Sequence, residues 1–198
     1  MKKAVIYIHG KRGNAAESAH FEPLFPDCDV IGFDYKAEMP WDSKAELTQY
    51  FDEMCRKYDS VCVIGNSIGC FYAMNAQIDG KVDMAYFISP VVDMEKFILG
   101  MMAGANVTED ELREKKEITT ANGAVLSWEY LSYVRSNPLR WSAPSHILYG
   151  EFDNLTDIDA VTAFAEKIGA SLEVMKGGEH WFHTDEQMEY IDKWIRSF

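Results

Sequence analysis

The sequence lacks the long hydrophobic runs that would place it in a membrane. No stretch approaches the roughly 18 consecutive apolar residues that a membrane-spanning helix requires. The apolar run near the N-terminus, Ala4–Ile8, stops at His9-Gly10, before it reaches the usual signal-peptide core of about 7–15 residues, and no small-residue cleavage site follows. We therefore expect a soluble protein without a membrane partner, whose first apolar run is a strand.

Positive charge is also scarce. The chain has 19 lysine and arginine residues against 32 aspartate and glutamate residues, which gives a formal net charge of −13. Such a field repels the phosphates of nucleic acids, and no basic stripe is present to overcome it. We expect no nucleic-acid partner.

Paired cysteines and clusters of metal ligands are missing as well. The four cysteines, Cys28, Cys55, Cys62 and Cys70, include no C-x-x-C spacing. Reduced structural thiols are typical of the cytoplasm, which is where we place the protein. Outside the region around His180, cysteine, histidine and carboxylate side chains do not cluster, so we expect no bound metal.

What the sequence does contain is an alternation of short β-type segments with longer helix-like ones. This alternation predicts a parallel sheet with helices on both faces, because parallel strands need crossover connections. The 198 residues, of which 47% are hydrophobic, fit one domain spanning 1–198. The expected strands are Lys3–His9, Val30–Tyr35, Ser60–Gly65, Val82–Ser89, His146–Gly150 and Ser171–Met175, followed by a last amphipathic helix over about Thr184–Arg196.

One interval departs from this alternation of strands and helices. About fifty residues separate Ser89-Pro90 from the next strand, more than a single crossover needs. We expect a helical insertion over about 94–142. Its predicted helices are Met94–Met102, Thr108–Glu117 and Ala124–Val134, and its aromatic residues are Trp128, Tyr130, Tyr133 and Trp141.

A G-x-S-x-G pattern, Gly65-Asn66-Ser67-Ile68-Gly69, lies where an apolar strand ends and the helix-like segment Cys70–Gln77 begins. Composition alone would produce this pattern in roughly one chain in fifteen. Its position between strand and helix favours a nucleophile elbow, a tight turn that presents the Ser67 hydroxyl above the sheet. The alternative is a glycine-rich turn in which the serine caps a helix.

A serine hydroxyl needs a base and an orienting carboxylate before it becomes a good nucleophile. Asp153 follows the strand His146–Gly150, so it lies at the same sheet edge as the elbow. It could also be a turn or helix-capping aspartate. Glu151, Asp157 and Asp93 are the alternative acids.

The candidate base lies in the glycine-supported loop Gly177-Gly178-Glu179-His180, after the last predicted strand. We favour His180 over its neighbour His183. His20 and His146 lie far from this loop in the sequence, and we interpret them as structural or surface residues.

The chain order Ser67, Asp153, His180 is that of α/β-hydrolases. Over nearly its whole length the sequence resembles the small bacterial serine esterases of this superfamily. The motifs that carry the resemblance are His9-Gly10, G-N-S-I-G at 65–69, G-E-F-D at 150–153 and G-G-E-H-W-F at 177–182.

The resemblance implies a three-layer α/β-hydrolase fold without the first antiparallel strands of larger members, which leaves about six mostly parallel strands. It implies an oxyanion hole formed by the backbone N–H groups of Ile68 and Lys11. It also implies that the insertion is a cap, whose aromatic residues and Met101-Met102 line an acyl pocket or form the cap's own core.

The resulting hypothesis is hydrolysis of a small carboxylic ester through an acyl-enzyme on Ser67, with His180 as base and Asp153 as orienting acid. This chemistry requires no cofactor, and its partner is a small acyl substrate. A thioesterase or a peptidase could use the same three residues. A catalytically silent binding module with a hydrolase-like fold is the alternative from another class.

Overall fold

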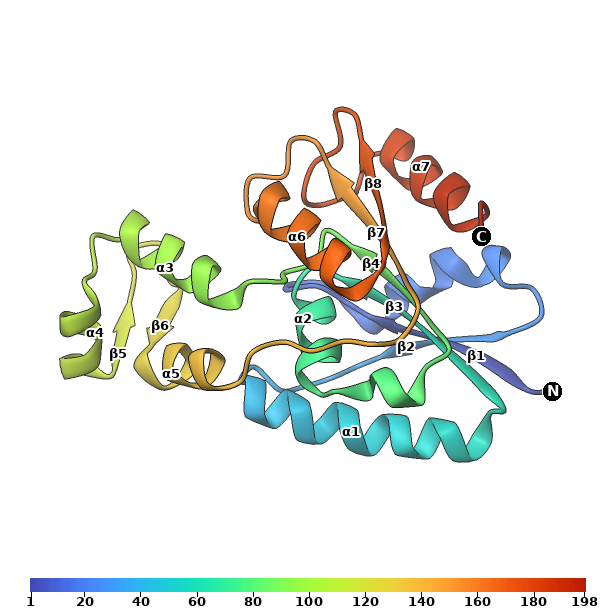
Figure 1. The fold of residues 1–198 in the computed structure, drawn as a ribbon, viewed down its shortest axis with the longest axis horizontal. Helices are drawn as coiled ribbons and strands as arrows, with labels where there is room; N and C mark the ends of the chain where they lie inside the picture. The colour runs from blue at the N-terminus through green and yellow to red at the C-terminus, as the bar shows by residue number, and fades with distance from the viewer. The chain divides into compact units, whose positions relative to one another are not determined.

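A six-stranded sheet lies at the centre of the larger part of the molecule (Figure 1). The computed structural model describes all residues, Met1–Phe198. The strand order is β2-β1-β3-β4-β7-β8, and every neighbouring pair is parallel. The predicted sheet of about six parallel strands is therefore confirmed. The strands are β1 (Lys3–Ile8), β2 (Asp29–Phe33), β3 (Ser60–Asn66), β4 (Met84–Ile88), β7 (Ser145–Gly150) and β8 (Ser171–Met175).

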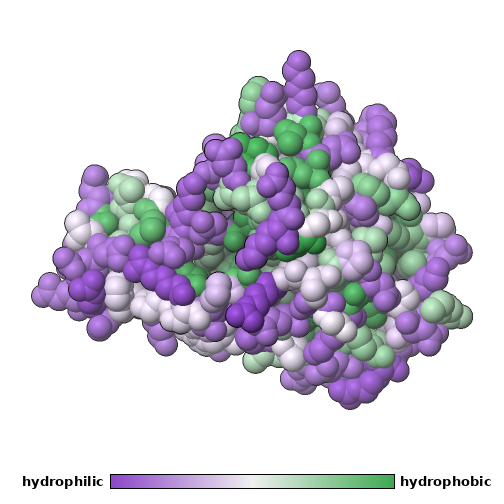
Figure 2. Space-filling view, in the orientation of Figure 1, coloured by the Kyte–Doolittle hydropathy of each residue, from purple (hydrophilic) through white to green (hydrophobic).

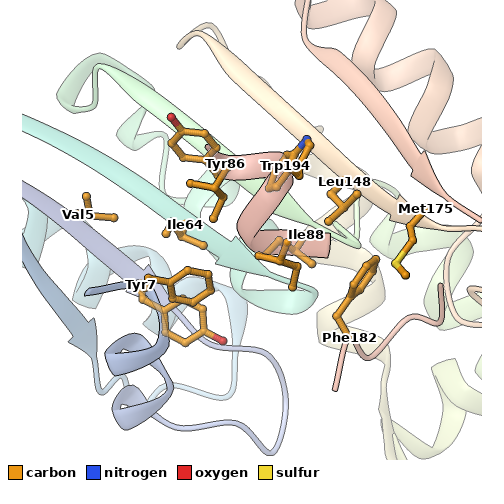
Figure 3. Packing of buried hydrophobic residues seen from close by; sticks show 12 residues of the cluster. Val5, Tyr7, Ile64, Tyr86, Ile88, Leu148, Met175, Phe182 and Trp194 are labelled. Atoms are coloured by element: carbon orange, nitrogen blue, oxygen red, sulfur yellow. The ribbon is translucent and has the colours of Figure 1, made fainter. Parts of the chain in front are cut away.

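The two faces of the sheet are covered by different helices, as in a three-layer α/β protein. The first face packs against η1 (Ala15–Leu24) and α7 (Asp185–Ile195), and Figure 3 shows the core between them. The opposite face carries α1 (Pro40–Lys57), α2 (Ile68–Asn75) and α6 (Ile158–Ile168), while the short η2 (Ile78–Lys81) precedes β4 (Figure 1). The central strand β3 is apolar on both faces because both are covered: Val61, Val63 and Ile64 are all buried.

By its contacts, the chain divides into two compact units. Residues 1–92 and 140–198 form the larger unit, called the sheet unit below, and residues 93–139 form the insertion. The insertion contains α3 (Met94–Gly104), α4 (Glu109–Lys115), α5 (Trp128–Ser136) and a two-stranded antiparallel hairpin of β5 (Glu117–Thr119) and β6 (Val125–Ser127). Its own buried residues are Met94, Ile98, Met102, Leu112, Leu126, Ser127 and Leu131.

The hairpin differs from the expectation of a purely helical insertion. A helix over Ala124–Val134 was expected, yet this segment begins with strand β6, and Ser127 then caps α5 by accepting a hydrogen bond from Tyr130 N at 3.3 Å. The turn at Asn122-Gly123, where Gly123 has φ 83°, reverses the chain. An Asn-Gly pair is a common hairpin signal, and it is the local cause of the difference.

Trp141 was also expected in the insertion, but it is part of the sheet unit. Its ring centroid lies 5.2 Å from that of Phe87 in β4, and its indole N–H donates to Ser145 Oγ at 2.7 Å. Separately, none of the helices is both long and apolar enough to cross a membrane.

Candidate active site

Ser67 occupies the turn between β3 and α2 with φ 52° and ψ −117°, a conformation that side-chain-bearing residues rarely adopt. Such backbone strain persists only where the surrounding structure enforces it. Here Ser67 N donates to Ile88 O at 2.9 Å, and Ser67 O accepts from Cys70 N at 3.1 Å and from Val91 N at 3.3 Å. Both main-chain polar groups of the serine are thus fixed by neighbouring elements.

The flanking glycines are needed for a steric reason. A Cβ on Gly69 would lie 2.3 Å from Ile8 O, and one on Gly65 would lie 3.0 Å from Cys70 Sγ. Real Cβ atoms do not approach a carbonyl oxygen as closely as 2.3 Å, so Gly69 lets α2 pack directly against β1. The G-x-S-x-G spacing therefore follows from the packing of this turn.

The structure brings the histidine that the sequence favoured next to this serine. His180 Nε2 lies 2.8 Å from Ser67 Oγ, although the two residues are 113 positions apart. His180 follows β8 in a loop that packs closely on the end of β7: a Cβ on Gly150 would lie 2.6 Å from both Gly178 O and Glu179 O. This backbone proximity places the imidazole over the elbow.

Asp153 completes a hydrogen-bonded series. Its Oδ2 lies 2.7 Å from His180 Nδ1 and accepts a hydrogen bond from Thr156 Oγ1 at 2.8 Å. Its Oδ1 accepts from Leu155 N and Thr156 N, both at 2.9 Å. Asp153 thus takes part in a turn, one of the roles that the sequence left open, and also contacts the imidazole.

Electrostatics keep this carboxyl group ionised. Burial by itself raises the pKa of Asp153, whose side chain is 0% exposed, but the hydrogen bond and charge of His180, with the amides of Thr156 and Leu155, outweigh it and lower that pKa. An ionised Asp153 accepts a hydrogen bond from the Nδ1–H group of a neutral imidazole. Nε2 is then left as an acceptor facing the Ser67 hydroxyl.

The alternative acids and base have other contacts. Asp157 caps α6 through Asp159 N at 2.8 Å, and Asp93 caps α3 through Lys96 N at 2.9 Å. Glu151 accepts from Gly177 N at 2.8 Å. His183 lies with Nδ1 2.5 Å from Trp181 O and stacks on that indole at 4.7 Å.

His20 and His146 have structural contacts, with Asp192 and Ser171 respectively.

A hollow of about 490 Å³ is lined by Tyr149, Asp153, Ile158 and Val174 among others. Neither Ser67 nor His180 lines it, so it lies outside the serine–histidine pair.

The segment after β1 lies against the elbow. A Cβ on Gly10 would be 3.3 Å from Ser67 Cβ and 3.4 Å from Asn66 O. The backbone N–H groups of Lys11 and Ile68, the two residues expected at an oxyanion hole, donate no hydrogen bond within the chain. Neither amide therefore has a hydrogen-bond partner within the protein.

Two residues of this region were not singled out from the sequence. Tyr7 is buried in β1, and its hydroxyl donates to Glu17 Oε2 at 2.6 Å. Glu17 also closes a capping box with Asn14 at the start of η1. The spacing Asn14-x-x-Glu17 is a capping-box signal that could have located the start of this helix.

Large hydrophobic side chains are exposed beside the site. Phe152 and Trp181, the neighbours of Asp153 and His180 in the sequence, are 66% and 70% exposed. The surface in Figure 2 likewise shows hydrophobic residues interspersed with hydrophilic ones. The loops that carry the acid and the histidine thus also present apolar surface.

Solved structures with this fold are numerous, whereas sequence comparison finds no relative: no protein-family model and no curated protein matches the chain. Est1E from Butyrivibrio proteoclasticus superposes with a TM-score of 0.78 at 18% identity, over 100% of this chain and 86% of that one. Mouse alpha/beta hydrolase domain-containing protein 10 has a TM-score of 0.78 at 15% identity, over 98% and 88% of the two chains.

A thioesterase domain from the curacin biosynthetic pathway is more distant, with a TM-score of 0.59 at 14% identity over 98% of this chain and 91% of that one. At such low identity these likenesses establish the fold. The chain has the α/β-hydrolase fold, as its motifs predicted.

Proposed function

We propose that the protein is a serine hydrolase that cleaves small carboxylic esters through an acyl-enzyme on Ser67. One observation carries the proposal: the hydrogen-bonded series from Ser67 Oγ to His180 Nε2 at 2.8 Å and from His180 Nδ1 to Asp153 Oδ2 at 2.7 Å, built on a strained elbow. A strained, glycine-flanked serine within reach of an oriented imidazole has the geometry of an activated nucleophile.

In the first step, Ser67 Oγ attacks the ester carbonyl carbon while His180 Nε2 takes the hydroxyl proton. The carbonyl π bond opens to an oxyanion, and the ionised Asp153 stabilises the imidazolium that forms. The oxyanion collapses, the bond to the alkoxy group breaks, and His180 returns the proton to the departing alcohol.

In the second step, water attacks the acyl-enzyme. His180 takes a proton from the water, a second tetrahedral oxyanion forms and collapses, and the proton returns to Ser67 Oγ as the carboxylic acid leaves. In both steps the free amides of Ile68 and Lys11 are the proposed donors to the oxyanion, because pre-oriented backbone donors stabilise negative charge that develops during reaction.

The exposed Phe152 and Trp181 support an uncharged substrate with an apolar group, and the net charge of −13 disfavours polyanionic ones. A thioester would react by the same steps with a thiol as leaving group. A panel that compares oxygen esters, thioesters and aminoacyl amides separates these leaving groups.

The direct test is labelling by a fluorophosphonate probe, with turnover of a short-chain aryl ester measured in parallel. We expect the probe to modify Ser67 and to abolish turnover, and Ser67→Ala to lower kcat by roughly 10³-fold or more. Ser136→Ala, which removes an exposed hydroxyl of α5, is the matched control and should keep full activity.

Full activity in Ser67→Ala would overturn the proposal. Wild-type protein that is neither labelled nor active, but that a small ligand stabilises against heat, would instead favour a silent binding module.

A further inference from the structure

The loop between β1 and η1, residues 9–14, would supply the Lys11 amide to the oxyanion hole. The contacts that fix this loop therefore affect the proposed function, on which this inference rests. Its carbonyl groups are restrained locally. His9 O accepts from Tyr35 Oη at 2.9 Å, and Gly10 O accepts from Gly13 N at 3.1 Å and lies 2.9 Å from His9 Nδ1. These contacts shape the loop but do not tie its far end to the elbow.

One side chain contacts both the far end of the loop and Tyr7, near the C-terminal end of β1. Glu17 Oε1 accepts from Asn14 N at 3.1 Å, and Glu17 Oε2 accepts from Tyr7 Oη at 2.6 Å. A carboxylate is an acceptor in both bonds, and hydrogen bonds to a charged group are stronger than neutral ones. Glu17 therefore links the start of η1 to a strand in the core of the sheet.

Tyr7 extends this link toward the nucleophile. Tyr7 is 2% exposed, and it pairs with Ile64 of β3, the strand that leads into the Ser67 elbow. Burial, reinforced by Glu17, raises the pKa of Tyr7, so the phenol keeps its proton and stays a donor to the carboxylate. A buried phenol without that acceptor would be left unsatisfied.

Space around the carboxylate is tight. A Cβ on Gly13 would lie 2.9 Å from both Glu17 carboxylate oxygens and 3.1 Å from His9 Cβ. The loop backbone thus passes directly over the Glu17 side chain on its way to η1. A shift of the carboxylate would displace Gly13. Because Gly13 N donates to Gly10 O, this displacement would also move Lys11, which lies between these two residues.

We propose that Glu17 is a positioning residue for the oxyanion hole: by binding Tyr7 Oη and Asn14 N together, it fixes the 9–14 loop beside the Ser67 elbow. Glu17 does not touch the substrate. Its removal lets the Lys11 amide move, which weakens binding of the tetrahedral oxyanion more than binding of the ground-state ester.

The test compares Glu17→Ala, Glu17→Gln and Tyr7→Phe with wild type in aryl-ester kinetics and in affinity for an alkylboronic acid, which forms a tetrahedral adduct with a reactive serine. Loss of a direct oxyanion donor costs about 10²–10³ in kcat, so we expect a loosened loop to cost roughly 10-fold. In Glu17→Ala, kcat should fall about that much with KM nearly unchanged, and boronate affinity should fall in parallel.

Glu17→Gln keeps an acceptor oxygen, so its kcat and its boronate affinity should lie between those of wild type and Glu17→Ala. The double variant Glu17→Ala/Tyr7→Phe should lose less than the product of the two single effects, because both side chains act through one contact. Tyr58→Phe is the matched control. It removes another tyrosine–carboxylate hydrogen bond, from Tyr58 Oη to Asp29 Oδ2 at 2.8 Å, at the N-terminal end of the strands and away from the loop, and it should keep wild-type kinetics.

All measurements are made below the melting temperature of each variant, so a general loss of stability does not imitate the effect. If Glu17→Ala melts at a lower temperature but keeps kcat and boronate affinity within about twofold of wild type, Glu17 has only a structural role and the inference is overturned. Wild-type protein that is neither labelled at Ser67 nor active would overturn the proposed function together with this inference.

Discussion

The sheet unit and the insertion differ in how closely their backbones pack. In the sheet unit, a Cβ on Gly69 or Gly150 would lie within 2.3 or 2.6 Å of a backbone oxygen. In the insertion, Gly100, Gly104 and Gly123 have no atom of another segment within 4 Å of the same position, which in the sheet unit is true only of the exposed Gly80, Gly169 and Gly177. Every residue of the candidate active site lies in the closely packed unit, as expected if catalytic geometry must be held by structure that cannot relax.

The side chains show the same contrast. On one face of the six-stranded sheet, the core of the sheet unit contains interlocked aromatic and aliphatic residues. In the insertion, a smaller set of buried residues is supplemented by Arg135, which pairs with Glu95 and Glu109 at 2.7 Å on the surface. Because exposed ion pairs contribute little, we expect the insertion to be the less stable of the two units.

The largest predicted effect lies in the tightly held site. Asp153→Asn replaces the carboxylate acceptor of His180 Nδ1 by an amide that can donate, which favours the tautomer with its proton on Nε2. That imidazole cannot accept the Ser67 proton, and kcat should fall by roughly 10³–10⁴-fold. Asp157→Asn in the same loop is the control, since asparagine caps a helix as well as aspartate does. Equal kinetics in the two variants would contradict the assignment of the acid.

The same residue predicts a pH dependence of stability. Because the pKa of Asp153 is lower in the folded than in the unfolded chain, its ionised form stabilises the fold at pH values above the unfolded pKa of about 3.9. This contribution is lost as the pH falls through the lower, folded pKa. Urea unfolding should show that Asp153→Asn has a lower free energy of unfolding than wild type at pH 7, and this difference should become smaller toward pH 2. A difference that becomes larger in acid would contradict the prediction.

Close backbone packing gives the next effect. Gly69→Ala forces a methyl group against Ile8 O and His9 O, so we expect a loss of about 3 kcal/mol or more in the free energy of unfolding. Surviving folded protein should also lose activity, because β1 and the elbow must separate. Urea denaturation of the variant measures the first effect and ester turnover the second. Wild-type stability would mean that α2 does not pack against β1 as closely as described.

Much of the sheet unit could be predicted from the sequence because its signals are local. The apolar run at β3, the glycines at 65 and 69 and the position of each candidate residue after a strand all follow from chain order and packing rules. The link from Glu17 to Tyr7 could not be predicted in this way. It joins residues of different elements through side chains, and only the folded arrangement of β1 and η1 brings them together.

The insertion was harder to predict because weaker signals compete there. The segment around Val125 has no extended pattern of regularly spaced apolar residues. A helix was expected to begin at Ala124, but the Asn122-Gly123 turn leads instead into β6, the second strand of a hairpin. Trp141 was assigned to the insertion by its place in the sequence, but it packs on Phe87 in the sheet unit. Aromatic content alone does not reveal which of two cores a residue joins.

A core truncation in the insertion tests whether the two units differ in stability. Leu131 is 0% exposed, and Leu131→Ala should cost about 2–4 kcal/mol through lost burial and the cavity left behind. Hydrogen exchange followed by mass spectrometry should show faster exchange over residues 93–139, while the amides of β3 and α2 keep their protection. Equal loss of protection along the whole chain would show that both units unfold as one.

The smallest predicted effect is a gain in stability. Gly100 lies exposed within α3, and the position that a Cβ would occupy is open. Alanine loses less conformational entropy than glycine in a helix, so Gly100→Ala should raise the stability of α3 by about 1 kcal/mol. Slower amide exchange over α3, with unchanged ester kinetics, is the expected measurement. A destabilised Gly100→Ala would show that α3 packs as tightly as the elbow helix, and the contrast between the two units would then fail.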